Sequence, residues 1–285
     1  MIQTTNKIAF QGDFGANSDM ACRDMFPTME PLPCPTFEDA FTALENGEAD
    51  LAMIPIENTI AGRVADIHYL LPDSRLHIVG EYFMPVHHQL LAPKGASLST
   101  IKTVESHVHA LGQCRNVIRK LKLKAIVAAD TAGSAREVSE AADITRASIA
   151  TRLAAKIYGL KILKADIEDE SHNTTRFVVL SRKASWASPS TKKVVTTFVF
   201  QVRNILAALY KALGGFATNG INMTKLESYM VGGSFSATQF YADVEGHPDH
   251  APLKRALSEL EFFCKKDTLR ILGVYPAHKF RDTLD

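Results

Sequence analysis

Two adjacent hydroxyls, an amide and a guanidinium stand together in Asn173-Thr174-Thr175-Arg176-Phe177, directly before an apolar run at residues 178–180. The apolar run predicts a buried strand, so these polar groups are expected where that strand begins. A buried polar group without a partner costs about 1–3 kcal/mol, so these groups must bind one another or a ligand. Taken alone, the pentapeptide also fits an ordinary strand start in which Asn173 caps a turn.

Four more clusters of polar residues and glycines follow predicted strands in the first 180 residues. They are residues 11–15 with Ser18, residues 55–59 with Gly62, Ser106-His107, and residues 130–134. Ligands of open α/β sheets bind outside the carboxyl ends of strands, where such loops converge. Each cluster alone is a weak signal, because Ser, Thr, Asp and Asn also cap helices. Five clusters in series favour a binding site, and residues 131–134, before a helix, favour a bound carboxylate.

The elements that must position these clusters alternate between strand-like and helix-like patterns, which is typical of an α/β layered domain. Strands are predicted at residues 8–10, 51–56, 80–91 (a long strand pair or crossover) and 125–129. Helices are predicted at residues 18–26, 37–46, 110–121, 133–142 and 148–158. Residues 183–193 are rich in serine and charged at both ends, which indicates a linker.

The chain after the linker has the order strand, helix, strand, strand, helix, strand. The segments are residues 194–202, 205–216, 221–229, 235–244, 252–262 and 268–274, with a hairpin turn at Gly232-Gly233. This order over about 80 residues is the ferredoxin-like arrangement.

Composition limits the function classes. The 285 residues are 46% hydrophobic and 22% charged, and 32 basic against 31 acidic residues give a net charge of +1. Without a concentrated basic tract, a nucleic-acid partner is not expected. No apolar run approaches the roughly 18–20 residues needed to span a bilayer, and the N-terminus has no apolar signal region. The four cysteines lie far apart and match no zinc spacing, so we expect free thiols in a reducing compartment. Together these observations predict no membrane partner and a cytoplasmic location.

The glycine-containing loop at residues 12–15 does not match a dinucleotide-binding fingerprint, because it lacks the third glycine, and no Walker-type loop is present. We expect no cofactor and no metal. The chemistry should then need only positioning, hydrogen bonding and proton transfer. His107 is a possible general acid–base, since histidine titrates near neutral pH. We favour the alternative that it starts a helix or lies in the core with both ring nitrogens satisfied.

The polar clusters together resemble the motifs of the prephenate dehydratase family, over nearly the whole chain. Residues 12–18 resemble its first loop, residues 54–59 its I-P-I-E-N motif, and residues 106–114 its S-H-P-Q-A-L-x-Q-C motif, with Val108 and His109 replacing Pro and Gln. Residues 130–135 resemble the next motif, and residues 173–177 the T-R-F signature. The resemblance implies conversion of prephenate to phenylpyruvate with loss of water and carbon dioxide, in phenylalanine biosynthesis.

The resemblance also implies a fold and its boundaries. We expect an α/β protein with a two-lobed catalytic region like type 2 periplasmic binding proteins, and a C-terminal ferredoxin-like α+β ACT domain. The catalytic region covers residues 1–182, the linker residues 183–192, and the regulatory ACT domain residues 193–285.

Thr175 is the residue that the resemblance places at the leaving hydroxyl of the substrate. A threonine hydroxyl is a very weak acid, so Glu57, if burial keeps it protonated, is a candidate to supply the proton. The alternative is that Glu57 fixes its loop by accepting backbone N–H bonds. The expected substrate-binding residues are Asn58, Thr59, Ser106, Thr131, Ser134, Asn173 and Ser18. Arg176 should face away from Thr175 and form a structural salt bridge.

Phenylalanine is the effector that the family's ACT domains bind, at an interface between paired copies. The residues implied here are Asn204, Ala207, Ala208, Leu209, Asn222, Glu227 and Ser228. The chain departs from the family at Leu206 and Ala207, where Pro and Gly are usual, and at Tyr229-Met230, where Arg-Pro is usual. We therefore expect feedback inhibition by phenylalanine and a homodimer or homotetramer, with a ligand-free dimerisation module as the alternative. Arogenate dehydratase and a non-catalytic cytoplasmic amino-acid sensor are the rival functions.

Overall fold

The computed structural model describes residues 5–230 and 238–283. The chain forms two compact units, Met1–Val64 with Tyr82–Phe177, and Ala65–Glu81 with Val178–Asp285. The chain changes unit three times: between Val64 and Ala65, within β5 (His77–Pro85) and within β11 (Thr174–Ser181). Among the described residues, each helix is too short or too polar to cross a bilayer.

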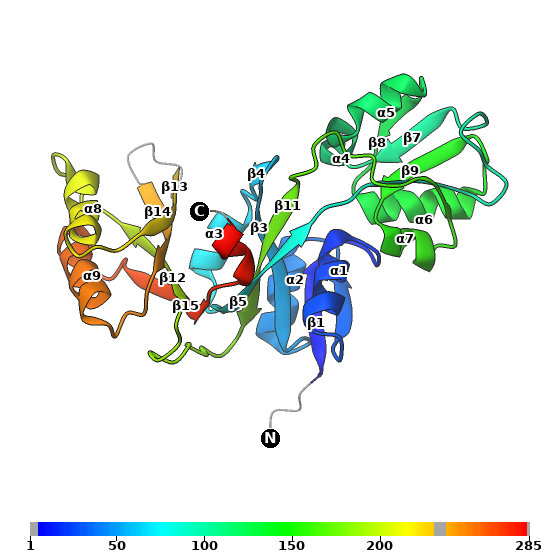
Figure 1. The fold of residues 1–285 in the computed structure, drawn as a ribbon. Coiled ribbons are helices and arrows are strands. Elements are labelled where there is room, and N and C mark those ends of the chain that lie inside the picture. Colours follow the sequence, from blue (N-terminus) through cyan, green and yellow to red (C-terminus); the bar gives the residue numbers. More distant parts are fainter. Residues whose placement is uncertain (1–4, 231–237, 284–285) are drawn as a thin grey trace. The chain divides into compact units, whose positions relative to one another are not determined.

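The first lobe of unit 1 contains a sheet in the order β11-β3-β1-β2, whose strands β1 (Lys7–Gln11), β2 (Glu30–Cys34) and β3 (Leu51–Asn58) are parallel. The short β4 (Gly62–Arg63) pairs with the end of β3. Helices α1 (Asn17–Met25) and α2 (Phe37–Asn46) pack on these strands (Figure 1). The two helices and the strands β1, β3 and β11 match predicted segments, whereas β2 and β4 were not predicted. The prolines of β2 are tolerated because β2 is an edge strand.

Helix α2 shows how the local sequence sets the element bounds. Thr36 and Asp39 form a capping box at its start, and Gly47 ends it in the left-handed conformation with φ 82°. Glycine adopts this conformation without steric cost, as a helix stop requires.

The second lobe of unit 1 has a five-stranded sheet in the order β10-β6-β9-β7-β8. Its strands are β6 (Gln89–Ala92), β7 (Thr103–Ser106), β8 (Lys124–Val127), β9 (Arg146–Ala150) and β10 (Lys161–Lys164). Its helices are α4 (Val108–Gln113), α5 (Arg115–Lys120), α6 (Thr131–Ala141) and α7 (Arg152–Ile157). Helices α4 and α5 cover one face of the sheet, and α6 and α7 cover the other (Figure 1).

Two helix predictions in this lobe are wrong in part. Residues 148–150 belong to β9, which lies between β6 and β7 and is buried on both faces, and only residues 152–157 are helical. A short apolar run of this kind does not distinguish a buried strand from a helix. The helix predicted at 110–121 is two helices, divided at Cys114.

Unit 2 contains the predicted ferredoxin-like order. Its elements are β12 (Val194–Gln201), α8 (Ala208–Thr218), β13 (Met223–Met230), β14 (Thr238–Glu245), α9 (Ala251–Phe263) and β15 (Arg270–Pro276). The sheet order is β13-β14-β12-β15, and α8 packs beside α9 over a core that includes Phe198, Phe216 and Leu260 (Figure 1). The turn predicted at Gly232-Gly233 lies outside the described residues. Helix α8 begins three residues later than predicted, because Ala207 is left-handed.

Unit 2 also includes α3 (Ile67–Asp73), the first part of β5 and the short 3-10 helix η1 (Lys279–Thr283). The Arg270 guanidinium ties α3 to β15 by donating to the carbonyl oxygens of Pro72, Ser74 and Leu76 at 2.6–2.9 Å. Residues 65–81 therefore pack with the C-terminal part of the chain, although the sequence places them in the catalytic region.

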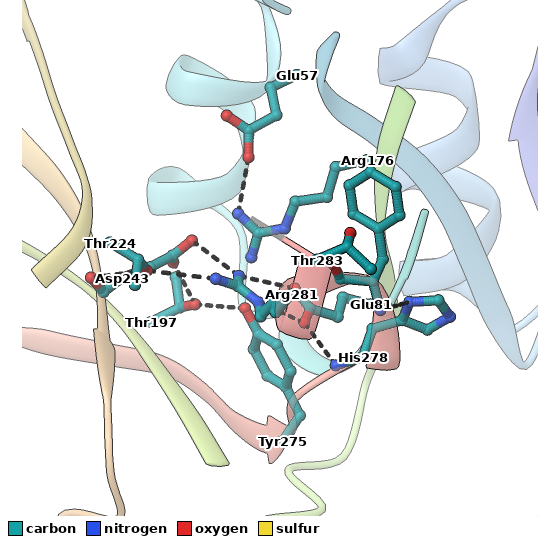
Figure 2. A network of polar contacts seen from close by, with 11 residues as sticks. Glu57, Glu81, Arg176, Thr197, Thr224, Asp243, Tyr275, His278, Arg281 and Thr283 are labelled. Atoms are coloured by element: carbon teal, nitrogen blue, oxygen red, sulfur yellow. Dashed lines mark hydrogen bonds and ion pairs between the residues drawn. The ribbon is translucent and has the colours of Figure 1, made fainter. Parts of the chain in front are cut away.

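A polar network holds η1 in unit 2 (Figure 2). Arg281 binds Glu81 with two parallel bonds, from Nε to Oε1 at 2.7 Å and from Nη2 to Oε2 at 2.9 Å. The same Nη2 lies 3.8 Å from Asp243 Oδ2, and Nη1 donates to Thr224 Oγ1 at 3.3 Å. Both carboxylate side chains are fully buried, so this guanidinium is an important source of compensating charge.

Candidate active site

Thr175 and Asn58 meet on adjacent strands of the first lobe, as the convergence of polar clusters predicts. Thr175 is the second residue of β11, and Asn58 is the last residue of β3. Asn58 Nδ2 donates to Thr175 Oγ1 at 3.0 Å and to Asn173 Oδ1 at 2.8 Å. Asn58 is 115 positions from Asn173 and 117 positions from Thr175 in the sequence, so only the fold brings it to them.

The orientation of the Asn58 amide is fixed by the backbone. Its Oδ1 accepts from the N–H groups of Ile60 at 2.9 Å and Ala61 at 2.8 Å. A side-chain nitrogen in that place would face two donors, so Nδ2 must point toward Thr175. Thr175 Oγ1 is therefore an acceptor in this contact, and its hydrogen has no acceptor among the described residues.

Asn173 extends this cluster to the second lobe. Its side chain is buried, and its Nδ2 donates to Gln113 Oε1 at 2.8 Å, at the end of α4. Sequence reasoning did not select Gln113 as a site residue, although it lies in the quoted motif at residues 106–114. Its position seven residues after Ser106, at a helix end that follows a strand, was the available signal.

Glu57 forms an ion pair with Arg176, whose Nη1 lies 2.9 Å from Glu57 Oε1 (Figure 2). The Arg176 side chain is 3% exposed, and the carboxylate is 33% exposed. The predicted salt bridge of Arg176 is thus confirmed. Its positive charge favours the ionised carboxylate over the neutral acid, so the geometry does not support Glu57 as the proton donor.

Thr59 links the end of β3 to residues around the start of β11 by two hydrogen bonds of its hydroxyl. Its Oγ1 donates to the His172 carbonyl at 2.8 Å and accepts from Thr174 N at 2.9 Å. The hydroxyl is thus occupied by the backbone, which favours a role in holding the loop rather than in binding substrate.

Ser106 and Ser134 are buried in the second lobe and are occupied by protein partners. Ser106 Oγ donates to the Ile149 carbonyl at 2.6 Å, and Ser134 Oγ lies 2.7 Å from Ser148 Oγ. Their hydroxyls join β7 to β9 and α6 to β9. Among the described residues, no hydrogen bond joins either serine to Thr175, so a carboxylate-binding role for them stays a prediction.

The start of α6 is occupied by a carboxylate of the chain itself. Asp130 Oδ1 accepts from Gly133 N at 2.6 Å and caps the helix. Thr131 Oγ1 has no hydrogen-bond partner in the described part of the chain. Ser18 is buried in the first turn of α1. For these two residues, substrate binding remains a prediction.

His107 starts α4, and its Nδ1 accepts from His109 N at 3.3 Å. Burial, and then the neighbouring charge of His109, lower the pKa of His107. This agrees with the helix-start interpretation. Of the described residues, His87, Asp166 and Glu168 form a group that could hold a cation. His87 Nδ1 already lies 2.7 Å from Glu168, and an Arg152 nitrogen 3.6 Å from Asp166 opposes a cation there.

The residues predicted to bind phenylalanine fall in two places in unit 2. Asn204, Ala207, Ala208 and Leu209 line a pocket of about 290 Å³ at the start of α8, together with Phe240. The other three predicted residues, Asn222, Glu227 and Ser228, are not in its lining and lie in or next to β13. Ala207 is left-handed, with φ 56°, at the position where the family usually has glycine.

Comparisons with known proteins identify the family of the chain. A family model for prephenate dehydratase matches residues 8–185. A bifunctional N-acyl-homoserine lactone acylase/prephenate dehydratase of Komagataeibacter europaeus is 50% identical, over 96% of this chain and 97% of that protein. Arogenate dehydratase/prephenate dehydratase 2 of Arabidopsis thaliana is 38% identical, over 95% of this chain and 73% of that protein.

A solved structure agrees as well. Prephenate dehydratase of Arthrobacter aurescens in complex with L-Phe superposes with a TM-score of 0.86 at 28% identity, over 95% of this chain and 90% of that one. The expected α/β fold is confirmed, and the chain belongs to the prephenate dehydratase family.

Proposed function

We propose that this chain converts prephenate to phenylpyruvate, and that Thr175 assists departure of the ring hydroxyl. The supporting observation is the direction of the hydrogen bond at Thr175. Its Oγ1 accepts from Asn58 Nδ2, and its hydroxyl hydrogen has no acceptor among the described residues. Accepting a hydrogen bond through the oxygen also makes the O–H a stronger donor, because bonds in a chain polarise one another. A free, strengthened donor is what a leaving hydroxyl requires.

The reaction breaks the ring C–O bond and the bond from the ring to the departing carboxylate, and the pair of electrons left by carbon dioxide completes the aromatic ring. One proton must be taken up, because hydroxide leaves as water. Threonine cannot supply it as a net acid, so its role is to hydrogen-bond the oxygen on which negative charge develops. The proton then comes from solvent or from substrate-bound water.

The pairing of Arg176 also fits the loss of carbon dioxide in this mechanism. Its guanidinium is paired with Glu57 and lies over the Phe83 ring, 5.8 Å from the ring centroid. A cation held in this way offers less attraction to the departing carboxylate. Strong binding of that group in the ground state would oppose decarboxylation.

The direct test is phenylpyruvate formation by the purified chain, with Thr175→Val as the variant that keeps the shape but removes the donor. We expect kcat to fall about 100-fold or more, as on removal of one donor from a developing oxyanion. Thr175→Ser, which restores the hydroxyl, is the matched control and should recover part of the activity. A valine variant with full kcat would remove Thr175 from the mechanism.

Arogenate is the alternative substrate, since the Arabidopsis relative is named for both activities. Parallel assays with prephenate and arogenate, compared as kcat/KM, decide between them. Catalysis on either substrate would exclude the sensor alternative.

Amide hydrolysis is a second candidate activity, because the 50% identical relative is also named an N-acyl-homoserine lactone acylase. Release of homoserine lactone and free fatty acid would reveal it. The Thr175→Val variant then tells whether the two activities share a site. Loss of both would indicate one site, and loss of prephenate turnover alone would indicate two.

We also propose that residues 193–285 form an ACT domain, that residues 1–182 form the catalytic region, and that phenylalanine inhibits. The pocket lined by Asn204 and Ala207 supports this, as does the L-Phe complex of the Arthrobacter protein.

A second copy of the chain could supply the residues on β13, which favours a homodimer or homotetramer. Light scattering with and without phenylalanine tests the assembly, and Asn204→Ala should raise the concentration needed for half-inhibition. Four free cysteines fit a cytoplasmic location.

A further inference from the structure

We propose that His88 is a positioning residue for the reaction at Thr175. In this proposal the Nε2–H of His88 orients the Gln113 amide and, through it, the hydrogen bonds of Asn173. The proposal rests on the function proposed above, and it concerns a residue that sequence reasoning did not select.

The direction of every bond in the chain follows from one backbone contact. Because Asn58 Oδ1 accepts from two backbone N–H groups, Asn58 Nδ2 must donate to Asn173 Oδ1. Asn173 must then present its Nδ2 to Gln113, whose Oε1 accepts at 2.8 Å. Reversing any one amide would set two donors or two acceptors against each other.

His88 stands at the far end of this chain. Its Nε2 lies 2.8 Å from the same Gln113 Oε1 that accepts from Asn173. Since that oxygen is an acceptor, Nε2 must carry the hydrogen. A ring protonated only at Nδ1 would place a lone pair against the lone pairs of Gln113 Oε1, which leaves two buried acceptors without a donor.

The surroundings of His88 hold it in place with a single ring proton. The residue is 4% exposed, and its backbone N–H donates to Glu168 Oε2 at 2.9 Å. Burial is the main cause that lowers the pKa of His88, which favours the neutral ring near neutral pH. The charged and titratable neighbours are His87 and Glu168, which contact each other at 2.7 Å.

The consequence is a second available donor. With Oε1 turned to His88 and Asn173, Gln113 directs its Nε2 hydrogens away from both, and that nitrogen has no hydrogen-bond partner among the described residues. Without His88, the Gln113 amide loses one of the two bonds that fix its orientation. His88 thus sets where a donor on the second lobe points.

The test compares His88→Leu, which removes the N–H, with His88→Gln, whose amide N–H can replace it. We expect kcat for prephenate to fall roughly 10-fold in the leucine variant, equivalent to about 1.4 kcal/mol, with partial recovery in the glutamine variant. KM should change much less than kcat. His87→Ala is the matched control, because His87 is adjacent and half-exposed but does not contact Gln113. Its kcat should stay close to that of the unchanged chain.

A double variant separates positioning from general stability. In a Gln113→Leu background, His88→Leu should cost little further kcat, because residues that act through one another are not additive. Full additivity, or a kcat unchanged by His88→Leu, would overturn the proposal. So would a glutamine variant with the same kcat loss and the same lowered melting temperature as the leucine variant. Absence of turnover by the unchanged chain would instead overturn the proposed function, and the His88 role with it.

Discussion

Replacing Arg281 with leucine should destabilise unit 2 far more than loss of an ordinary surface charge. The guanidinium binds Glu81 bidentately and lies 3.8 Å from Asp243 (Figure 2). Both acidic side chains are fully buried, while that of Arg281 is 13% exposed. Removing one partner of a buried ion pair costs about 3–5 kcal/mol, since the remaining charges stay desolvated.

Trp186 makes this loss measurable in the right part of the molecule. It is the one tryptophan of the chain and belongs to unit 2, and the next residue, Ala187, donates its N–H to the Val274 carbonyl at 2.8 Å. Tryptophan fluorescence in urea should therefore follow the unfolding of unit 2. With a slope of about 2 kcal/mol per molar urea, a loss of about 3–5 kcal/mol lowers the midpoint by about 1.5–2.5 M.

Lys193→Ala is the matched control for Arg281→Leu. Lys193 pairs with Asp282, also in η1, but the two side chains are 69% and 54% exposed. Exposed pairs contribute about 0–1 kcal/mol, so its midpoint should move by less than about 0.5 M. Arg281→Lys, which keeps the charge but loses the bidentate geometry, should fall between the two. Equal midpoints for Arg281→Leu and Lys193→Ala would refute the importance of this network.

Further predictions concern the backbone, the thiols and pH. Ala207→Gly should raise the free energy of unfolding by about 0.5–1 kcal/mol, because relief of the left-handed strain outweighs the added chain entropy. Ala217→Gly, inside α8, should instead lower it, and calorimetry measures both changes. Gly15→Ala should reduce stability and turnover, because its Cβ would lie 2.7 Å from Ala154 Cα; Gly112→Ala, with open space there, should not. Burial raises the pKa of every cysteine thiol, to about 11 for Cys264, so a thiol reagent at pH 8 should label the folded chain slowly and the urea-unfolded chain at all four sites. The pKa of His88 is lowered in the folded state, so its contribution to stability is present above about pH 6.5 and is lost as pH falls through the folded-state pKa. His88→Gln should flatten that part of the dependence of stability on pH. Urea unfolding at several pH values measures it.

The sequence predicts the main elements where the local signals are complete. The capping box at Thr36 and the glycine stop at residue 47 fix the bounds of α2, and the strand and helix order after the linker is confirmed. The signals fail where burial decides. Residues 148–150 form a strand because β9 is enclosed between β6 and β7, which no local pattern reveals.

The candidate site shows the same limit. Thr175 was selected from the family resemblance, and Asn58 and Asn173 were selected as candidate carboxylate-binding residues. The structure brings the three together. The same reasoning could not tell that the Ser106 and Ser134 hydroxyls are used inside the second lobe, or that Glu57 is paired with Arg176. Side-chain partners depend on contacts that are distant in the chain, and polar residues at strand ends look alike until those contacts are known.

The chain of amides also explains why residues from two lobes act together. Thr175 and Asn58 belong to the first sheet, while Gln113 ends a helix of the second lobe. The two segments that connect the lobes lie side by side, since Val86 N donates to the Asn173 carbonyl at 2.8 Å, and Asn173 and His88 both lie in them. Each hydrogen bond in the chain has one allowed direction, set by the backbone at Ile60 and Ala61. A change in the alignment of the lobes would break the chain at Asn173 and release the orientation of the Gln113 amide. The Thr175 hydroxyl and the Gln113 Nε2 group would then no longer be held in a fixed relative orientation. Catalysis should therefore depend on lobe alignment, even though the Thr175–Asn58 contact lies within one sheet.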